Sequence, residues 1–462
     1  MTVNGNQAVY KAGDQVALKF FVASGFYLIL VALVGVLMGI KIMNPDFLYN
    51  LRFDLLRPLH LQLMIFGWLS MVLMGAFYYI IPREVNKELF SPLMGNLHFI
   101  LMHVGILGVG AHLILGYSSG REYLEPILLL DIAVVLVWVI FTANMFITTF
   151  KGDIQEGNLL RKPALNFMML SVLYLGVNYL IGMVPLSGIR DGLAIWTFAH
   201  NAVNGWFMLG LMGVMYHIIP RLTGTLGAEP YHKKLTYIHF WSVVIFIPPS
   251  VLHHLLYDQA PINLFWKIAG EWTSVGMLLP TAIWVYIVAS SFKNSKLVTG
   301  VVGQFFMAAM IFYALNCVQG SVQSIRAINS FVHGTQWIVG HAHLALVGWI
   351  SFGIFGIVYY LVPRITGRNI YSDSLANTNL WLGVIGFVGM FIPLTIAGLI
   401  QGAAFSEGLS FFAAQQSIQS YMVMRAVAGV VYTLSAVVFA YNIYKSLSNE
   451  QVFVEPTTAA RA

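Results

Sequence analysis

The chain has 462 residues, of which 58% are hydrophobic, 14% aromatic and only 9% charged. Because a soluble globular domain carries roughly 25% charged residues, this composition excludes one and predicts an integral membrane protein. The net charge of +6 comes from basic residues that cluster on one side of the predicted spans, as described below. It is therefore poor evidence for nucleic-acid binding, and we expect no nucleic-acid partner. Cys317 is the single cysteine, which excludes a disulfide, a CxxCH haem-attachment motif and a thiolate metal cluster.

Apolar runs of about 20 residues, long enough to cross a bilayer, recur along the chain. They predict an all-α integral membrane protein with twelve transmembrane helices in a single domain, 1–462. The loops are too short for a separate soluble domain, and no clear internal repeat is evident. The predicted spans are 20–41, 57–82, 96–117, 124–150, 163–185, 193–219, 235–257, 271–292, 300–321, 337–363, 379–401 and 421–445.

The basic residues predict the orientation of these spans. An even number of spans places both termini on one side of the membrane. Most of the 24 Lys and Arg residues lie in the termini, in the even-numbered loops or at the adjoining helix ends, as Arg83, Lys151, Lys234 and Arg364 do. The positive-inside rule therefore predicts that both termini are cytoplasmic. We expect the cytoplasmic (inner) membrane of a bacterium or an archaeon.

Six of the 13 histidines fall at one predicted depth, in the outer third of the membrane. Ionisable residues inside a membrane are usually functional, so this shared depth predicts metal ligands, although a single one would be read as a hydrogen-bonded core residue. The six are His60 in span two, His200 in span six, His253 and His254 in span seven, and His341 and His343 in span ten. The structural, hydrogen-bonding histidines are His98, His103, His112, His217, His239 and His333.

Helical geometry separates two kinds of histidine pair. His341 and His343 point to nearly opposite sides of a helix, because consecutive residues are about 100° apart, so they are expected to bind two different groups. His253 and His254 diverge by about 100°, so aiming both at one ion requires a distorted helix. Pro248 and Pro249 remove backbone donors one turn earlier and can bend it; shaping the packing is an equal alternative for them.

Five segments together resemble the catalytic subunit of the haem–copper oxidase superfamily. They are LRPLHLQLMIFGW, FAHNAVNGWF, LHHLLYDQAP, HGTQWIVGHAHLALVGW and YMVMRAVAG, in spans two, six, seven, ten and twelve. The likeness is greatest to the C-type oxidase and nitric oxide reductase branch and covers nearly the whole chain, including the twelve-helix plan.

This resemblance implies a cofactor for each ligand. His60 and His343 match the axial ligands of a low-spin haem b, and His341 matches the axial ligand of a high-spin haem b. His200, His253 and His254 match the ligands of a third metal, non-haem iron or copper. Basic partners for the haem propionates are expected at Arg57 and Arg425, with snorkelling to the interface as the alternative.

Three further expectations follow from the resemblance. The segment GREYLE at 120–125 is similar to one that supplies a calcium-binding glutamate, which matches Glu122; a solvated loop carboxylate is the ordinary alternative. Since the chain has no covalent-haem motif and no copper-binding cysteine pair, an electron-donating subunit is expected on the outer face, either a membrane-anchored c-type cytochrome or a cupredoxin-like protein. Direct quinol oxidation is an alternative.

The substrate depends on a missing tyrosine. Oxygen reductases of this superfamily use a tyrosine crosslinked to a histidine ligand, at positions that here hold Asn204 or Ile247. Reducing two nitric oxide molecules to nitrous oxide and water takes two electrons, which two facing metals can supply. We therefore predict a nitric oxide reductase, with an oxygen reductase that uses another radical donor as the alternative. Familiar nitric oxide reductases have glutamate where Asn204 stands, so Asn204 is a weaker ligand, a hydrogen-bonding residue or a packing amide.

The carboxylates at membrane depth, Asp131, Asp258 and Glu271, lie towards the outer side and predict proton uptake from outside. A cytoplasmic route of hydroxyls and histidines is the alternative, and its candidates are Tyr237, His239, Thr281 and Tyr286. A haem-bearing sensor or transporter that kept the same helices is a further alternative.

Overall fold

The computed structural model describes residues 4–152, 162–225, 233–256, 260–297 and 299–455. Twelve helical spans are long and apolar enough to cross a membrane, which confirms the predicted number and the all-α class. Within the described ranges the only β pairing is one isolated bridge, between Arg368 and Val452. The elements are α1 (Asn4–Met43), α2 (Phe53–Gln62), η1 (Leu63–Ser70), α3 (Met71–Glu84), α4 (Pro92–Ile114), α5 (Leu128–Phe150), α6 (Pro163–Met183), α7 (Ile189–Asn201), η3 (Ala202–Met208), α8 (Leu209–Thr223), α9 (Lys233–Ser250), η4 (Val251–Leu255), α10 (Leu264–Gly276), α11 (Leu278–Lys293), α12 (Gly300–Gln323), α13 (Arg326–Val332), α14 (Gln336–His343), η5 (Leu344–Ser351), α15 (Phe352–Thr366), α16 (Asp373–Ser406), α17 (Phe411–Ser417) and α18 (Gln419–Ser446).

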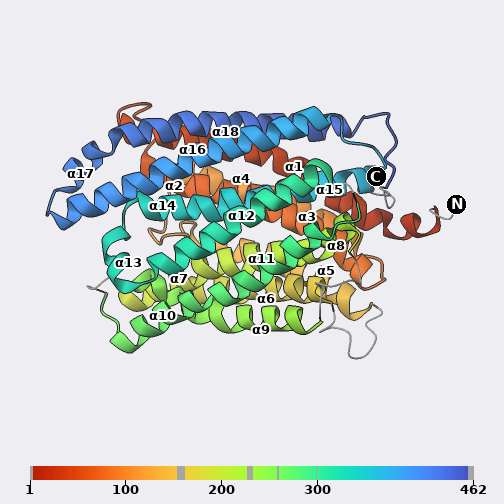
Figure 1. The fold of residues 1–462 in the computed structure, drawn as a ribbon, viewed down its shortest axis with the longest axis horizontal. Helices are drawn as coiled ribbons and strands as arrows, with labels where there is room; N and C mark the ends of the chain where they lie inside the picture. Colours follow the sequence, from red (N-terminus) through yellow and green to blue (C-terminus); the bar gives the residue numbers. More distant parts are fainter. Residues whose placement is uncertain (1–3, 153–161, 226–232, 257–259, 298, 456–462) are drawn as a thin grey trace.

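The long helices run roughly side by side along one axis, and the start of α1 and the end of the described chain lie at the same end of the bundle (Figure 1). α16 packs along α18, and α18 packs along α1. Several spans are longer than predicted, among them the first, the eighth and the eleventh, Asp373–Ser406. The first begins at Tyr10, and the eighth covers Leu264–Lys293 as α10 and α11. Both termini on one side follow from the even number of spans.

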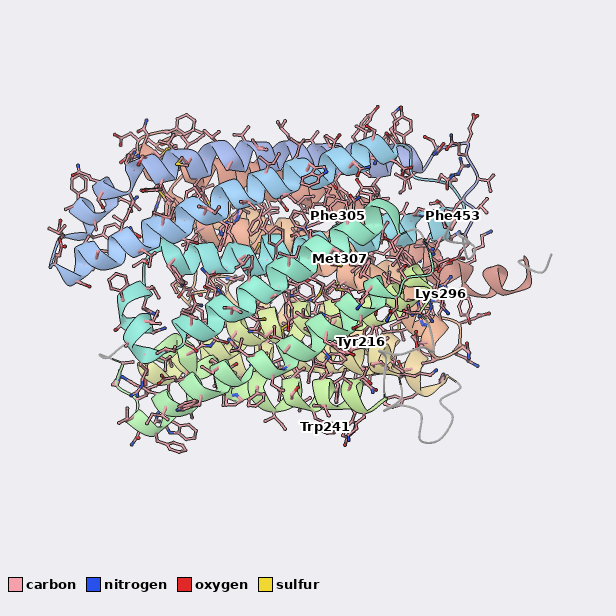
Figure 2. The ribbon with its side chains drawn as sticks, viewed as in Figure 1. Tyr216, Trp241, Lys296, Phe305, Met307 and Phe453 are labelled. Atoms are coloured by element: carbon pink, nitrogen blue, oxygen red, sulfur yellow. The ribbon has the colours of Figure 1, made fainter. Side chains whose placement is uncertain are left out.

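Three spans form the centre of the bundle. The second, sixth and tenth spans are 89%, 89% and 94% buried over their most apolar window, whereas the fourth span is only 22% buried. Figure 2 shows the difference for two side chains: Tyr216 lies among the helices and Trp241 points away from them. The central spans are also the ones that carry His60, His200, His341 and His343, so these ligand candidates lie in the most deeply buried spans.

The expectation of no internal repeat is wrong. Each central span has a Gly-Trp pair, a tyrosine ten residues after the tryptophan, and a Pro-Arg pair that starts four residues later. Each also contains a π-helical segment (η1, η3 or η5). The repeat is hard to see in the sequence because only a few residues are the same in all three spans. The apolar residues between them differ from one span to the next. The repeated residues are Gly67, Trp68, Tyr78, Pro82 and Arg83; Gly205, Trp206, Tyr216, Pro220 and Arg221; and Gly348, Trp349, Tyr359, Pro363 and Arg364.

Buried hydrogen bonds join the three repeats. Trp206 Nε1 donates to Ser70 Oγ at 2.9 Å, and Trp68 Nε1 donates to Ser351 Oγ at 3.0 Å. A third tryptophan–serine bond of this kind is not formed, because Met208 stands where the other two repeats have serine. Within the described chain, Trp349 Nε1 is buried and has no hydrogen-bond partner. The indole–hydroxyl bonds fix the mutual register of spans two, six and ten.

Each π-helical segment begins within three residues of a ligand candidate, since Leu63 follows His60, Ala202 follows His200 and Leu344 follows His343. π-bulges widen a helix locally and occur frequently at functional sites. The widened turns therefore lie at the same level as the histidines, in the interior of the bundle.

Candidate metal centre and haem cavity

Three of the six predicted histidines converge on one point. The ligand atoms of His200, His253 and His254 all lie within 4.8 Å of one another, and this is the one such group of three in the part of the chain that the structure describes. His254 Nε2 lies 3.2 Å from His200 Nδ1 and 3.1 Å from His253 Nε2. Imidazole nitrogens this close, in an apolar surrounding, suit an iron or copper ion.

A change of helix type brings the two adjacent histidines together. Pro248 and Pro249 end α9 at Ser250, and the backbone continues as the 3₁₀ segment η4 through His253 and His254. Proline lacks the N–H that an α-helix needs, so the regular hydrogen-bond ladder stops here. The predicted distortion is therefore present, and the two imidazole rings lie 4.3 Å apart between centroids.

Neighbouring side chains hold the three imidazoles, and sequence reasoning missed them. His200 Nε2 is paired with Ser250 Oγ at 2.9 Å, and His253 Nδ1 with Ser274 Oγ at 2.9 Å. The indole of Trp196 stacks on His254, with centroids 4.1 Å apart and planes within 10°. Such partners orient metal ligands and tune their basicity. Ser274 comes from another span, so no sequence pattern marks it.

Asn204 lies beside His200, one turn further along the span. Its Nδ2 is 3.4 Å and 3.3 Å from the two ring nitrogens of His200 and 3.2 Å from the His200 carbonyl oxygen. Asn204 therefore lies against one member of the three-histidine group, and its role towards a metal stays a prediction. Ile247 is fully buried and Tyr237 is 48% exposed, while Tyr257 falls outside the described residues. Among the described residues, the hydrogen-bond partners of the three imidazoles include no tyrosine.

A second site is a cavity of about 410 Å³ between spans one, two, ten and twelve. His60 and His343 both line it. Their Nδ1 atoms lie 3.0 Å from the Val31 carbonyl oxygen and 2.8 Å from the Val339 carbonyl oxygen. When Nδ1 is occupied in this way, Nε2 is left as the ligand atom. A Cβ on Gly35 would come within 2.9 Å of His60 Cε1, so the absence of a side chain there makes room for this imidazole.

The charges around this cavity fit an anionic cofactor. Arg425 and Arg57 both line it. Arg425 is 9% exposed, and within the described residues no carboxylate pairs with it. A buried, unpaired guanidinium is costly, so a cavity with two imidazoles and this cation suits a haem whose propionates supply the missing negative charge.

His341 points to the other side of span ten, as predicted from its spacing to His343. Its Nδ1 is 3.2 Å from Oε1 of Gln319 on α12. A Cβ on Gly320 would come within 3.2 Å of His341 Cε1. His341 also lies within electrostatic range of His253. One helix therefore presents an imidazole towards each of the two sites.

The loop 115–127 contributes carboxylates at the rim of the cavity. Glu122 forms an ion pair with Arg57, and it belongs to no group of three metal-ligating side chains in the described chain. Calcium at Glu122 stays a prediction, because other ligands, such as propionates, have to complete the site. Glu125, which sequence reasoning did not single out, is buried, with Oε1 accepting from the Tyr123 N–H at 3.0 Å and Oε2 unpartnered. Burial raises the pKa of Glu125.

The predicted membrane-depth carboxylates have different surroundings. Asp131 is buried and accepts a hydrogen bond from Tyr179 at 2.8 Å. Glu271 pairs with Arg326 at 2.8 Å, and Asp258 lies outside the described residues. On the alternative cytoplasmic route, Tyr237 and Tyr286 are exposed.

The other two candidates for the alternative cytoplasmic route, His239 and Thr281, each lie next to a tyrosine hydroxyl inside the bundle. His239 Nδ1 pairs with Tyr216 at 2.8 Å, and Thr281 Oγ1 lies 3.4 Å from the Tyr313 hydroxyl. His98 and His103 likewise pair with Tyr78 and Tyr27, as expected of hydrogen-bonding histidines.

The fold is that of a multi-pass membrane protein, and its two sites suit a metal ion and a haem. The chain belongs to the family described as cytochrome c and quinol oxidase polypeptide I, whose model matches residues 15–431. Members of this family bind haems and a copper or iron centre, and work with electron-donating c-type cytochrome subunits in a membrane.

Individual relatives carry two kinds of name. A cytochrome c oxidase subunit 1 homolog of Agrobacterium tumefaciens is 27% identical over 95% of this chain and 84% of its own. In Stutzerimonas stutzeri, a Cbb3-type cytochrome c oxidase subunit CcoN1 is 26% identical (89% and 90% covered), and a nitric oxide reductase subunit is also 26% identical (95% and 94% covered). A solved heme-copper terminal oxidase dimer shares the fold, with a TM-score of 0.79, 17% identity, and 97% and 86% of the chains covered.

Proposed function

We propose that the protein is the catalytic subunit of a nitric oxide reductase, which converts two nitric oxide molecules to nitrous oxide and water. The observation that carries the proposal is the neighbour of His200: the side chain one turn along the span is the amide of Asn204, not a phenol. We assign His60 and His343 to a low-spin haem b, His341 to a high-spin haem b, and His200, His253 and His254 to the third metal.

Electron counting supports this substrate. Cleaving dioxygen takes four electrons at once. The two metals that would be bound at the reaction site would give three, two from the haem iron and one from the third metal, so a nearby phenol is needed there for the fourth. Coupling two nitric oxide molecules takes two electrons and two protons. The bound metals supply these electrons, whereas the chain's own residues orient the ligands, exclude water and deliver protons. The absence of a phenol from Asn204's position removes little from the second reaction.

The alternative is an oxygen reductase with another radical donor, and the oxidase names of several relatives support it. Four-electron oxygen uptake, without nitrous oxide from nitric oxide, would identify it.

The third metal is iron or copper in our proposal, with three imidazoles as its firm ligands. Asn204 contributes its carbonyl oxygen as a weak fourth ligand, or hydrogen-bonds a bound intermediate. An amide does not take up a proton near neutral pH, so Asn204 is not the proton donor.

A nearly apolar cavity of about 340 Å³ supports a small gas as the substrate. It lies between α5 and α6 and reaches Phe198 and Ala202, the residues that precede and follow His200 by two positions. Apolar gases concentrate in the bilayer, and we assign this cavity as their way in. A narrowing change such as Ala202→Leu is expected to lower kcat/KM more than kcat.

We infer that protons come from the outside, through Glu125 and Asp131. Both carboxylates are buried, and Glu125 has one unpartnered oxygen; they lie at the end of the spans that the positive-inside rule predicts to face outside. Electrons come from a c-type cytochrome or cupredoxin-like subunit docked on the outer face, in the cytoplasmic membrane. In reconstituted vesicles, proton uptake from the cytoplasmic side during turnover, or active pumping, would contradict this route.

The decisive test uses the purified complex. Metal analysis is expected to give two haems and one further iron or copper per chain. Anaerobic turnover with nitric oxide is expected to give one nitrous oxide for every two nitric oxide molecules. His254→Ala should lose the third metal and the activity, whereas His103→Ala, whose ring pairs with Tyr27, should keep both. A fully metallated complex that forms no nitrous oxide would refute the assignment.

A further inference from the structure

The internal repeat ends in the same way in all three central spans. The arginine of each Pro-Arg pair folds back over the last turn of its own helix. It donates from Nη1 to the carbonyl oxygen of the residue four positions earlier, at 2.9, 2.7 and 2.8 Å. The dipole of a helix stabilises a cation at its C-terminus, so each guanidinium is fixed at the end of its span. The arginines are Arg83, Arg221 and Arg364, and the carbonyl oxygens belong to Tyr79, His217 and Tyr360.

Two of these guanidinium groups are each held by a carboxylate and an aromatic ring. Arg83 donates to both carboxylate oxygens of Asp14 on α1, at 2.7 and 2.8 Å. Arg364 donates to Oε1 of Glu455, beyond the end of α18, at 3.0 and 3.1 Å. In both cases the guanidinium carbon lies 3.6 Å from the centre of the tyrosine ring one turn earlier. Charge-assisted bonds and stacking of this kind hold an arginine in one position.

The third guanidinium group belongs to a larger network. Arg221 Nη2 lies 3.5 Å from Oε1 of Glu84, and the same oxygen is 2.5 Å from His217 Nδ1. Lys162 donates to the backbone carbonyl oxygen of Glu84. Since Glu84 directly follows Arg83 in the chain, this network adjoins the first arginine–carboxylate pair.

The three groups form one layer across the end of the central spans. α3, α8 and α15 pack against one another, and they end where α1 begins (Figure 1). Tyr360 lies within electrostatic range of Arg364 and Arg221. Tyr79 lies within electrostatic range of Arg83 and Arg364. We call the following residues the arginine layer: Arg83, Arg221 and Arg364 with Asp14, Glu84 and Glu455.

Groups that can carry protons lie directly inside this layer. Tyr78 and Tyr216 are the repeated tyrosines of two central spans, one turn before the arginines. Their hydroxyls pair with the buried imidazoles of His98 at 3.0 Å and His239 at 2.8 Å. Imidazoles and hydroxyls can pass protons along a chain. Protons from the adjoining solvent would enter this chain if nothing stood in between.

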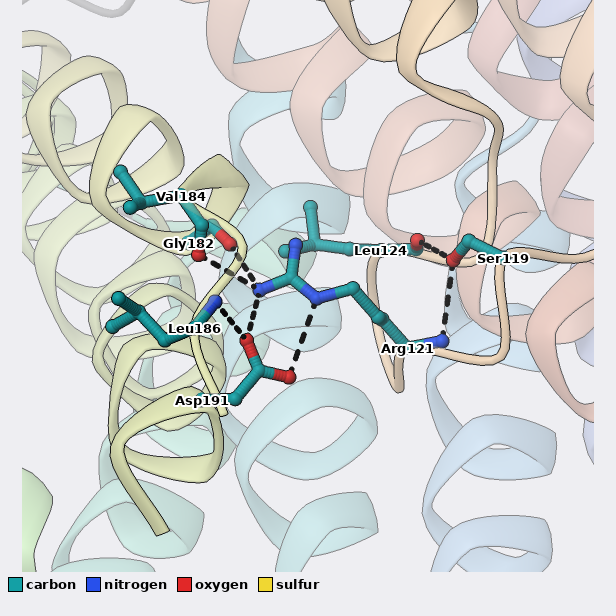
Figure 3. Close-up of polar contacts among 7 residues, drawn as sticks. All are labelled: Ser119, Arg121, Leu124, Gly182, Val184, Leu186 and Asp191. Atoms are coloured by element: carbon teal, nitrogen blue, oxygen red, sulfur yellow. Dashed lines mark hydrogen bonds and ion pairs between the residues drawn. The ribbon is translucent and has the colours of Figure 1, made fainter. Parts of the chain in front are cut away.

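The opposite end of the bundle is built differently. There, Arg121 donates to Asp191 at 2.7 Å, and it donates to the carbonyl oxygens of Gly182 and Val184 at 2.8 Å and 3.3 Å (Figure 3). These bonds tie the loop 115–127 to α7, which carries Asp191 in its first turn. In the same loop, the buried carboxyl of Glu125 keeps one oxygen without a partner among the described residues. That end offers a carboxylate oxygen that can take up a proton, whereas cations occupy the carboxylates of the arginine layer.

We propose that the arginine layer is a barrier to protons, which closes the end of the bundle that carries both termini. A guanidinium does not give up its proton in a protein, so it does not pass one on. Fixed cations also repel an approaching hydronium ion, as an arginine does in selective pores. The layer thereby leaves the opposite end as the entry for protons. This role rests on the proposed uptake of protons from outside, but not on nitric oxide as the substrate.

The experiment measures passive proton flow through the oxidised, metal-loaded complex in lipid vesicles, with no nitric oxide or reductant present. A potassium gradient and valinomycin set the membrane potential, and a trapped pH-sensitive dye records the proton influx. The wild type is expected to conduct no more than vesicles without protein. Arg364→Gln is expected to raise the influx about tenfold, which is the effect of removing a unit charge about 10 Å from the passing proton at an effective dielectric constant of about 20.

Three variants separate the charge of the layer from its packing. Arg364→Lys keeps a cation, and Glu455→Gln changes a side chain that is 69% exposed and leaves the guanidinium in place. Arg368→Gln removes an exposed arginine at the same end of the bundle. All three are expected to stay closed to protons. Haem content and thermal unfolding are measured on each preparation, and Arg221→Gln replaces Arg364→Gln if that variant does not assemble.

Two results would overturn the barrier. One is a wild-type influx in both Arg364→Gln and Arg221→Gln, and the other is an equal leak in Arg364→Lys, Glu455→Gln or Arg368→Gln. Nitrous oxide formation is measured separately on the same preparations. A closed layer in a complex that forms no nitrous oxide would refute only the nitric oxide assignment, so the two failures are distinguished.

Discussion

Replacing Arg425 by methionine tests the assignment of the haem cavity. Arg425 is 9% exposed, lines the cavity with His60 and His343, and has no paired carboxylate in the described chain. A positive charge in this place opposes the oxidised haem, whose iron carries one more positive charge than the reduced form. Removing it is therefore expected to lower the midpoint potential of the low-spin haem.

The size of the change follows from Coulomb's law. Two unit charges at 4 Å and an effective dielectric constant of 20 interact by about 4 kcal/mol; if a haem bound in this cavity held its iron at about twice that distance from the guanidinium, Arg425 would contribute about 2 kcal/mol. Because about 1.4 kcal/mol corresponds to 59 mV for one electron, the expected drop is about 80 mV. Spectroelectrochemical titration of the low-spin absorbance band measures it.

Arg425→Lys is the matched control, since it keeps the charge and is expected to keep most of the potential. Haem content is measured alongside, because loss of the propionate partner also weakens haem binding. A low-spin haem at full occupancy in Arg425→Met, with the wild-type potential, would refute the reasoning and place the haem elsewhere.

Three other changes test separate parts of the structure. Ser274→Ala removes the partner of His253 Nδ1 and should weaken third-metal binding about 10–100-fold, measured by chelator competition; unchanged metal affinity would show that the serine only packs. Ser70→Ala leaves the Trp206 indole N–H buried without an acceptor and should lower stability by about 1–3 kcal/mol, read from thermal unfolding in detergent; an unchanged midpoint would contradict this. In Glu125→Gln, the rate of nitrous oxide formation should fall and lose its pH dependence. Burial raises the pKa of the Glu125 carboxyl, so in the wild type the protonated carboxyl, and with it the rate, declines as the pH rises through that pKa. Parallel pH profiles in the variant and the wild type would count against the proton route.

Much of this protein is determined locally by its sequence. The low charge and the apolar runs give the twelve spans, because backbone in lipid must form helices whose hydrogen bonds are all internal. The spacing of His341 and His343 places them on opposite sides of one helix, and Pro248 and Pro249 predict the break that brings His253 and His254 together. These inferences need only helical geometry and the donor that proline lacks.

Other features depend on which helices become neighbours, and only the tertiary structure decided them. Ser274 reaches His253 from another span, Gln319 reaches His341 across a helix pair, and the loop residue Tyr123 lies against Trp196. A single sequence records which residues are polar, but not which distant polar or aromatic group each one meets. Packing of the neighbouring spans and loops against the three central spans sets those distances, and with them the cavity beside Arg425.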